Sequence, residues 1–167
     1  LDAARTLLEA GADKVSVNSA AVERPRLLAE MAQAFGRQST VLALDAARRD
    51  GGWEVVVRSG THRTGRDALE WAREAVELGA GEVLLTSWDR DGTRSGYELD
   101  LVRAVAEAVP VPVVASGGAA GPQDLLDGLQ AGAQAVLVAS LLHDGDTTVA
   151  DLKEWLLARG AEVRPCW

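Results

Sequence analysis

Small, hydroxylic and acidic residues follow several apolar runs of this sequence, at the points where the runs end. They are Asn18-Ser19, Asp45, Thr86-Ser87 with Asp89 and Asp91 shortly after, Ser116-Gly117-Gly118, and Ala139-Ser140. Where helices cover parallel strands, ligands bind beyond the carboxyl ends of the strands. Backbone N–H groups beside small residues and short hydroxyl donors suit phosphate, and a carboxylate there is available for acid/base chemistry.

Two of these strand ends are the strongest candidates for phosphate binding. ASGGAAG (residues 115–121) and VASLLHDG (residues 138–145) both place small residues where a strand gives way to a helix. The candidate phosphate ligands there are Gly117, Gly118, Ala139 and Ser140. The alternative is that the glycines only form a tight turn between strand and helix. Asn18-Ser19 is a weaker candidate of the same kind, for which capping of a short helical turn is the alternative.

Asp45 stands at the end of the apolar segment TVLALDA (residues 40–46). A carboxylate in this position loses hydration unless it has a partner or a wet site, and partial burial can tune its pKa for a general acid or base. The alternative is a carboxylate that is paired with Arg48 or Arg49, just downstream. Acid/base chemistry often needs two groups, and the second would come from Asp91 or from outside this chain.

The elements that would position these residues form a repeated unit. GADKVSVNS (residues 11–19), GAGEVLLTS (79–87) and GAQAVLVAS (132–140) each begin with Gly-Ala, continue with a short apolar run and end in a hydroxylic residue. Each follows a stretch with apolar residues at i, i+3, i+4 and i+7, which predicts a helix. The leading glycines stand where the residue after a helix must accept a positive φ. The unit is therefore a helix, a glycine stop, a buried strand and a polar end.

Further elements are predicted between and after these units. Strands are expected at residues 40–46 and 111–118, and a short strand at 53–59 is expected to pair locally after the turn at 50–52. The predicted helices are residues 4–10, 25–36, 68–78, 99–108, 122–131 and 149–159. Apolar strands that alternate with helices indicate an α/β fold with a parallel sheet, in a single domain spanning residues 1–167. Periodicity alone leaves a doubly wound sheet and a (β/α)₈ barrel open.

The bulk composition argues against several classes of protein. A net charge of −8 disfavours general binding to nucleic acid, which needs clustered Lys and Arg. The single cysteine, Cys166, allows neither a disulfide within the chain nor a zinc site built from cysteines, so a cytoplasmic location is expected. No apolar run approaches the roughly 18 residues of a membrane-spanning helix. The two histidines lack metal-ligand spacing, and no metal or cofactor is expected.

The polar strand ends lie within segments that resemble one family closely. GADKVSVNSAAVERP, VLALDA, ELGAGEVLLTSWDRDGTRSGYE and VVASGGAAG are similar, in this order, to the cyclase subunit of imidazole glycerol phosphate synthase, an enzyme of histidine biosynthesis. The phosphoribosylformimino ribonucleotide isomerase of the same pathway is a near relative and shares the RDGT segment. ADKVSVN, LLTSWDRDGT and SGYE resemble the cyclase more.

The resemblance implies a (β/α)₈ TIM barrel that acts on a substrate with a phosphate at each end. In that family, ammonia from a glutaminase subunit passes through the barrel, and the products are imidazole glycerol phosphate and an aminoimidazole carboxamide ribonucleotide. Two aspartates at the barrel mouth act as acid and base, and Asp45 matches the second. The positions that match substrate or phosphate contacts are Asn18, Ser19, Thr86, Asp91, Gly92, Gly118, Ala139 and Ser140. The positions that match the glutaminase interface and ammonia entrance are Asp13, Lys14 and Glu82, which precede strands.

The resemblance begins within the third helix of the family's barrel, so its first three strands and first catalytic aspartate have no counterpart here. We therefore expect about five βα units of an incomplete barrel, with two open sheet edges and an apolar inner surface. The favoured interpretation is a piece of a longer gene product, with little or no turnover by these 167 residues alone. The alternative is a non-catalytic, phosphate-binding scaffold that self-associates through its open edges.

Overall fold

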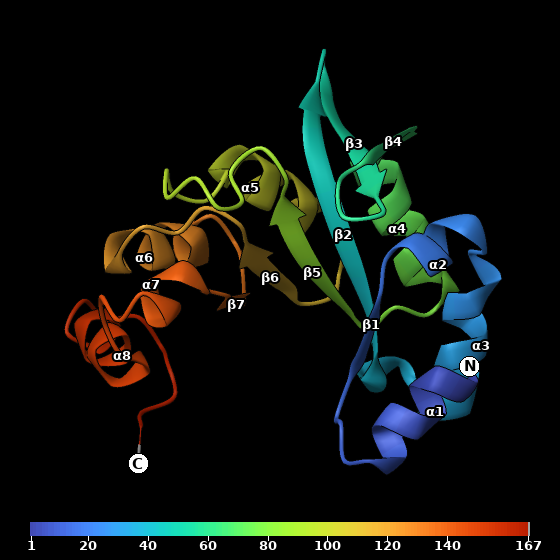
Figure 1. The fold of residues 1–167 in the computed structure, drawn as a ribbon, viewed down its shortest axis with the longest axis horizontal. Coiled ribbons are helices and arrows are strands. Elements are labelled where there is room, and N and C mark those ends of the chain that lie inside the picture. The colour runs from blue at the N-terminus through green and yellow to red at the C-terminus, as the bar shows by residue number, and fades with distance from the viewer. Residues whose placement is uncertain (167) are drawn as a thin grey trace.

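The computed structural model describes residues 1–166, in which seven strands form one curved sheet with helices around its outside (Figure 1). Five strands run parallel, in the chain order β1-β2-β5-β6-β7. They are β1 (Val15–Val17), β2 (Thr40–Arg49), β5 (Glu82–Ser87), β6 (Val113–Ser116) and β7 (Ala135–Val136). Among the described residues β1 and β7 each pair with one neighbour, so the parallel sheet has the two open edges that were expected.

The helices that the sequence predicted are all present. They are α1 (Asp2–Glu9), α3 (Arg26–Phe35), α4 (Ala68–Leu78), α5 (Leu99–Ala108), α6 (Pro122–Gln130) and α8 (Val149–Leu157). Three short elements were not predicted, because each is too short to show a helical period. They are α2 (Ser19–Glu23), α7 (Ser140–His143) and a 3₁₀ turn (Arg37–Ser39). None of the helices within residues 1–166 has the length and apolar character needed to cross a membrane.

The glycine stops that the repeated unit predicted are confirmed by the backbone. Gly11, Gly79 and Gly132 have φ angles of 106°, 127° and 111°, a region that L side chains rarely adopt. Gly79 is also limited by packing, since a Cβ there would lie 2.5 Å from the Cβ of Ala32 in α3. These glycines end the helices and let the chain turn into the strands that carry the polar residues.

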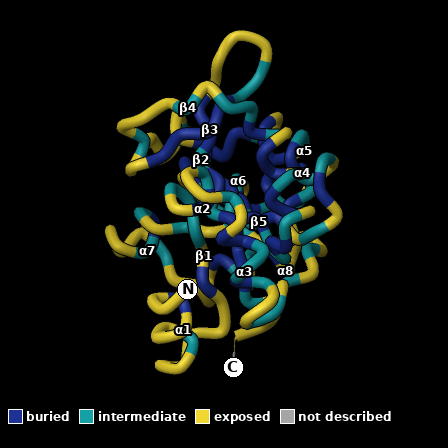
Figure 2. The backbone as a smooth tube through the Cα atoms, turned by 90° about the vertical axis from the view of Figure 1, so that its right-hand side faces the viewer, coloured by how far each residue is buried: buried dark blue, intermediate teal, exposed yellow. Residues whose placement is uncertain are grey.

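The main hydrophobic core lies between the parallel sheet and the helices. Leu42 and Leu44 of β2 are fully buried, and they belong to one cluster with Trp71 of α4 and Leu101 of α5. Alternate residues of a strand point to opposite faces, so these leucines take one face of β2 and leave the other to the concave side. Figure 2 shows the buried segments gathered in β2, β3 and α4, whereas α1 and the turn after β2 are exposed.

The register of the parallel strands aligns the residues of the concave face in rows. The middle row consists of Ala43, Leu84, Val114 and Ala135. The next row, nearer the carboxyl ends of the strands, consists of Asp45, Thr86 and Ser116. Such layers of inward-facing side chains are the packing found inside (β/α)₈ barrels. On the concave face, the polar row therefore lies next to the apolar row, at the carboxyl ends of the strands.

A hairpin at the end of β2 confirms the short strand predicted at residues 53–59, with its local pairing after the turn at 50–52, and adds a second strand that was not predicted. The structure has two antiparallel strands there, β3 (Gly52–Val57) and β4 (His62–Asp67), and β3 pairs with the extended end of β2. The sequence of β4, HRTGRD, contains no apolar residue. It therefore shows no hydrophobic alternation, and its backbone pairing with β3 alone makes it a strand.

The last parallel strand is shorter than the apolar run predicted within residues 132–140. Only Ala135–Val136 is a strand, although the N–H of Gln134 donates to the carbonyl of Val113 and that of Leu137 to the carbonyl of Ala115. Within the described residues β7 has a neighbour on one side only, which limits its ladder. Beside it lies a largely apolar cavity of about 590 Å³ between α6, α8 and residues 162–164.

Candidate active site and anion pocket

Asp45 lies at the centre of the polar row and is held by its neighbours. The amide Nδ2 of Asn18, just after β1, donates a 2.8 Å hydrogen bond to Oδ2 of Asp45. Thr86, level with Asp45 on β5, forms a further side-chain hydrogen bond with it. Burial raises the pKa of the Asp45 carboxyl, the bonds with Asn18 and Thr86 oppose that shift, and the nearby charge of Asp91 adds to it. The net pKa is above the ordinary value for Asp, which favours a carboxyl that can both give and take a proton.

The alternative interpretation of Asp45, a carboxylate paired with Arg48 or Arg49, is wrong. Arg48 pairs with Glu98 instead, and Arg49 pairs with Asp67 at 2.9 Å. Both arginines lie beyond Asp45 on the part of β2 that continues into the hairpin. Asp45 therefore faces the mouth of the sheet without a cationic partner among the described residues.

Asn18 and Ser19 do not cap the short helix that follows them. Asn18 is at the N-cap position of α2, but no side-chain capping bond is present there. Its Nδ2 is directed to Asp45, and its Oδ1 is buried without a hydrogen-bond partner within residues 1–166. The Oγ of Ser19 accepts a 3.0 Å hydrogen bond from the N–H of Arg58, at the turn of the β3–β4 hairpin. The capping alternative is therefore wrong, and Asn18 belongs with Asp45.

Glu98 is a buried carboxylate that sequence reasoning missed. Its Oε1 accepts bonds from the guanidinium of Arg48 and from Nε1 of Trp53 at 2.8 Å, and its Oε2 accepts from Oγ of Ser87 at 2.8 Å. Burial would raise its pKa, but the bonds from Trp53, Ser87 and Arg48 outweigh burial, and the pKa is lowered. The lowered pKa favours the charged form of Glu98. In this form its hydrogen bonds link the hairpin, the end of β5 and the start of α5.

The loop between β5 and α5, residues 88–97, is fixed at both sides. The bond between Ser87 and Glu98 closes its base. Its far end is tied down where the N–H of Gly96 donates to the carbonyl of Gly118 at 2.8 Å and the hydroxyl of Tyr97 donates to the carbonyl of Leu137 at 2.7 Å. The loop thus lies directly over the ends of β6 and β7, which explains its unusual density of polar and glycine residues.

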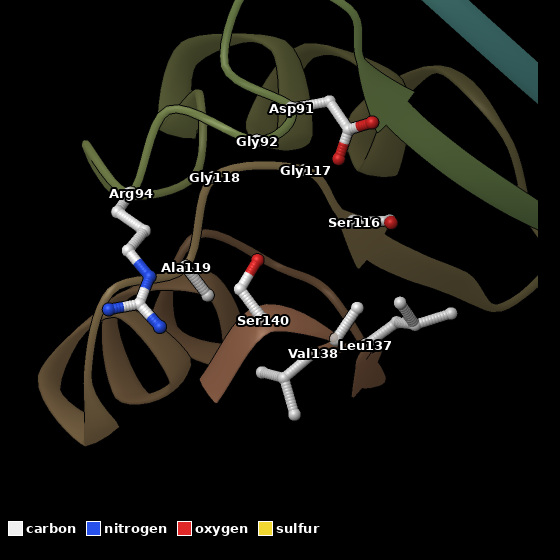
Figure 3. Close-up of a pocket in the computed structure, with 11 residues that line it drawn as sticks. Asp91, Gly92, Arg94, Ser116, Gly117, Gly118, Ala119, Leu137, Val138 and Ser140 are labelled. Carbon is white, nitrogen blue, oxygen red and sulfur yellow. The ribbon is translucent and has the colours of Figure 1, made fainter. Parts of the chain in front are cut away.

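A small pocket of about 30 Å³ lies beneath this loop (Figure 3). It brings together six of the residues that the sequence singled out: Asp91, Gly92, Gly117, Gly118, Ala139 and Ser140. Arg94 and Ser116 also line it, although neither was predicted as a ligand. In Figure 3, Asp91 and Arg94 extend from the loop on one side, and Ser140 points toward them from α7 on the other. The volume of the pocket suits a small group rather than a whole nucleotide, because drug-sized ligands fill pockets roughly ten times larger.

Gly117 and Gly118 are required by the packing of two loops. A Cβ on Gly117 would lie 2.8 Å from the carbonyl oxygen of Ser87, and one on Gly118 would lie 2.5 Å from that of Gly96. Both residues also have positive φ angles. The tight-turn interpretation therefore explains why these residues are glycines. It leaves the phosphate role of these two residues as a prediction.

Two predicted groups lie apart from the pocket. Asn18 and Ser19 are at the opposite end of the polar row, beside β1. Lys14 and Glu82 form an ion pair at the amino-terminal ends of β1 and β5, and Asp13 is exposed next to them. The sequence correctly separated these positions, because residues before and after parallel strands lie at opposite ends of the strands.

Comparisons with known proteins identify the family of this fold and site. The family described as histidine biosynthesis protein matches residues 1–148. The chain belongs to this family. Within the histidine biosynthesis family it is 56% identical over 165 residues to the imidazole glycerol phosphate synthase subunit HisF of Synechococcus sp. (strain CC9605), covering 95% of this chain and 64% of the relative. It is 49% identical over 164 residues to the protein of the same name from Exiguobacterium sibiricum, covering 98% of this chain and 66% of the relative.

Membership of the histidine biosynthesis family decides between the two architectures that periodicity left open. The parallel strands belong to a (β/α)₈ barrel rather than to a doubly wound sheet, and the described residues form an open part of such a barrel. The chain spans slightly less than two thirds of the length of the curated relatives that it matches.

Proposed function

We propose that this chain carries out part of the reaction of the cyclase subunit of imidazole glycerol phosphate synthase. In that reaction, ammonia cyclises and cleaves a ribulosyl-formimino carboxamide ribonucleotide that bears two phosphates. The products are imidazole glycerol phosphate and aminoimidazole carboxamide ribonucleotide. The observation that carries the proposal is the row of Asp45, Thr86 and Ser116, which connects a carboxyl of raised pKa to the small pocket.

Asp45 is the acid/base group in this proposal. A neutral carboxyl can donate a proton to a leaving group, and the carboxylate that remains can accept one in the next step. The raised pKa of Asp45 extends the range of pH over which the neutral form is present. Asn18 and Thr86 fix the carboxyl by hydrogen bonds, so its orientation does not depend on the substrate. The second acid/base group comes from Asp91 or from outside this chain.

The two ends of the polar row fit a substrate with two phosphates. The pocket of Gly117, Gly118 and Ser140 lies at the β6–β7 end, and Asn18-Ser19 lies at the β1 end, with Asp45 between them. Backbone N–H groups at the turn of the glycines and at the start of α7 would hold one phosphate. Thr86 lies between the pocket and Asp45, where it would contact the middle of the substrate, and Gly92 lines the pocket itself.

We also propose that the glutaminase subunit binds at the amino-terminal ends of the parallel strands. The curated relatives are named as subunits of a synthase. Asp13 and the ion pair of Lys14 with Glu82 form a charged surface at the amino-terminal ends of the strands. Ammonia that enters there would reach Asp45 along the concave face. Loss of glutamine-dependent turnover in Lys14→Met, with ammonia-dependent turnover retained, is the expected sign of this contact.

The test of the proposed function is an assay with two substrates. The chain is joined to the remaining third of the barrel from the Synechococcus relative, of which it covers 64%. The cyclase substrate with ammonia is expected to yield both products, and the substrate of the related isomerase is expected to remain unchanged. Isomerisation without cyclisation would overturn the proposal in favour of the isomerase.

A non-catalytic scaffold is the second candidate, and the apolar cavity beside the open edge of β7 favours it. If the scaffold interpretation holds, the 167-residue chain sediments as an oligomer and the joined barrel forms no product. Product formation by the joined barrel rules the scaffold out as the whole function.

A further inference from the structure

Arg94 lines the small pocket but has no role in the proposed function. Among the described residues that line the small pocket, it is the only basic one, and Asp91 is the only acidic one. Its guanidinium is turned to the carboxylates of Asp144 and Asp146, at 2.6 Å and 2.8 Å. These two residues follow α7 and do not line the pocket themselves. Arg94 therefore stands between the pocket and a pair of carboxylates on its rim.

We propose that Arg94 is a ligand of the phosphate group in this pocket, and that Asp144 and Asp146 compete with the phosphate for it. The proposal rests on the proposed function, since it takes the pocket to be a phosphate site. Figure 3 shows the side chain of Arg94 reaching down from the loop toward Ala119. The planar guanidinium binds phosphate oxygens through two parallel N–H groups, which a lysine cannot do.

The geometry of the ion pairs leaves part of Arg94 available. Both contacts are made by Nη2, and within residues 1–166 no acceptor is bonded to its Nε or Nη1. Each of those two groups can donate a single bond to an anion before the ion pairs break, whereas a parallel pair of N–H groups must include Nη2 and therefore displaces a carboxylate. The backbone holds the side chain in this region, because Arg94 has a φ of 53° and its loop is tied to Gly118 through Gly96.

The carboxylates compete weakly, because all three side chains are exposed to solvent. The exposed fractions are 39% for Arg94, 60% for Asp144 and 46% for Asp146. Ion pairs between exposed side chains contribute little and are screened by salt. A phosphate dianion in the pocket gains charge-assisted bonds in a less hydrated place. The competition therefore lowers the affinity for phosphate without abolishing it, and it neutralises Arg94 while the pocket is empty.

The experiment measures binding of inorganic phosphate to the 167-residue chain at constant ionic strength, by NMR of the amide groups of Gly118 and Ser140. Arg94→Ala is expected to weaken binding about tenfold or more. The double variant Asp144→Asn/Asp146→Asn is expected to tighten it about threefold. Adding Arg94→Ala to the double variant is expected to remove that gain. Arg103→Ala is the matched control, because Arg103 forms an exposed ion pair with Asp100 on α5.

The opposite signs of the two changes separate competition from a structural role. If the ion pairs only hold the loop in place, the double variant weakens phosphate binding as Arg94→Ala does, and the inference is overturned. It is also overturned if Arg94→Ala binds phosphate as the unchanged chain does, a result that leaves the proposed phosphate site intact. If no variant binds phosphate, the phosphate site of the proposed function fails and the inference fails with it.

Discussion

The side-chain amide of Asn18 donates a 2.8 Å hydrogen bond to Oδ2 of Asp45, so the ends of two neighbouring strands meet in one polar contact. The bond fixes a carboxyl that burial would otherwise leave poorly solvated. It also lowers the pKa of Asp45, against the larger effect of burial. The acid strength of Asp45 is therefore set by the balance between its depth in the sheet and the donors around it.

Removing the amide donor is expected to raise the pKa of Asp45 further. In Asn18→Ala the charged form loses a hydrogen bond while the carboxyl stays partly buried. The pKa can be measured by NMR titration of the Asp45 carboxyl carbon. Ser19→Ala is the control, because the Oγ of Ser19 bonds to the N–H of Arg58 instead. An unchanged or lower pKa in Asn18→Ala would contradict the assigned role of this bond.

Asp45→Asn is expected to increase the free energy of unfolding near pH 7, by an amount on the order of 1 kcal/mol. The folded-state pKa of Asp45 is raised, so the folded chain holds this proton more tightly than the unfolded chain. The protonated Asp45 carboxyl stabilises the fold fully at pH values below the ordinary Asp pKa. This stabilisation is lost as pH rises through the raised folded-state pKa of Asp45. The gain from Asp45→Asn should therefore be present near pH 7 and absent near pH 3. Denaturant unfolding at both pH values measures this gain in the free energy of unfolding. Asp50→Asn is the control, because Asp50 is exposed in a turn.

Glu98→Gln is expected to lower the free energy of unfolding by about 2 kcal/mol near pH 7, because a buried charged acceptor of several bonds loses its charge. The folded-state pKa of Glu98 is lowered. Its contribution is therefore present above the ordinary Glu pKa and is lost as pH falls through the lowered value. The difference between the two chains should shrink toward low pH. Glu107→Gln, an exposed change on the same helix, should show no such difference.

Gly118→Ala is expected to cost about 1–3 kcal/mol of stability and to displace the loop of residues 88–97. Gly118 has a φ of 105°, and a Cβ there would lie 2.5 Å from the carbonyl oxygen of Gly96. Gly121→Ala is the matched control, since its φ is −170° and nothing lies within 4 Å of a Cβ at that position. Thermal unfolding compares them, and equal losses in the two variants would show that the close approach is unimportant.

Local patterns in the sequence predicted the helices, the glycine stops and the strand ends. Gly79 illustrates why: its positive φ and its place after an amphipathic run depend only on neighbouring residues. Asp45 was predictable for the same reason, as a charge that ends an apolar strand. The row that joins Asp45, Thr86 and Ser116 depends on the register of the parallel strands, which the sequence did not predict.

The missed features depend on partners far away in the chain. Glu98 accepts bonds from Arg48 and Trp53, which are 50 and 45 residues distant. Arg94 pairs with Asp144, also 50 residues away. The strand β4 forms by backbone pairing without any apolar alternation. No local pattern reports such contacts, although the Tyr97-Glu98 pair directly before a predicted helix was a signal that could have drawn attention to Glu98.

The most direct test of the account is the turnover of the joined barrel with Asp45→Asn. The cyclase substrate and ammonia are supplied at saturation, and product formation is followed across a range of pH. We expect a loss of at least about a hundredfold in kcat, because general acid/base groups contribute on that order or more, while Asp50→Asn retains full turnover. If Asp45→Asn keeps kcat within a few-fold of the unchanged chain, Asp45 is not the acid/base group and the central claim is wrong.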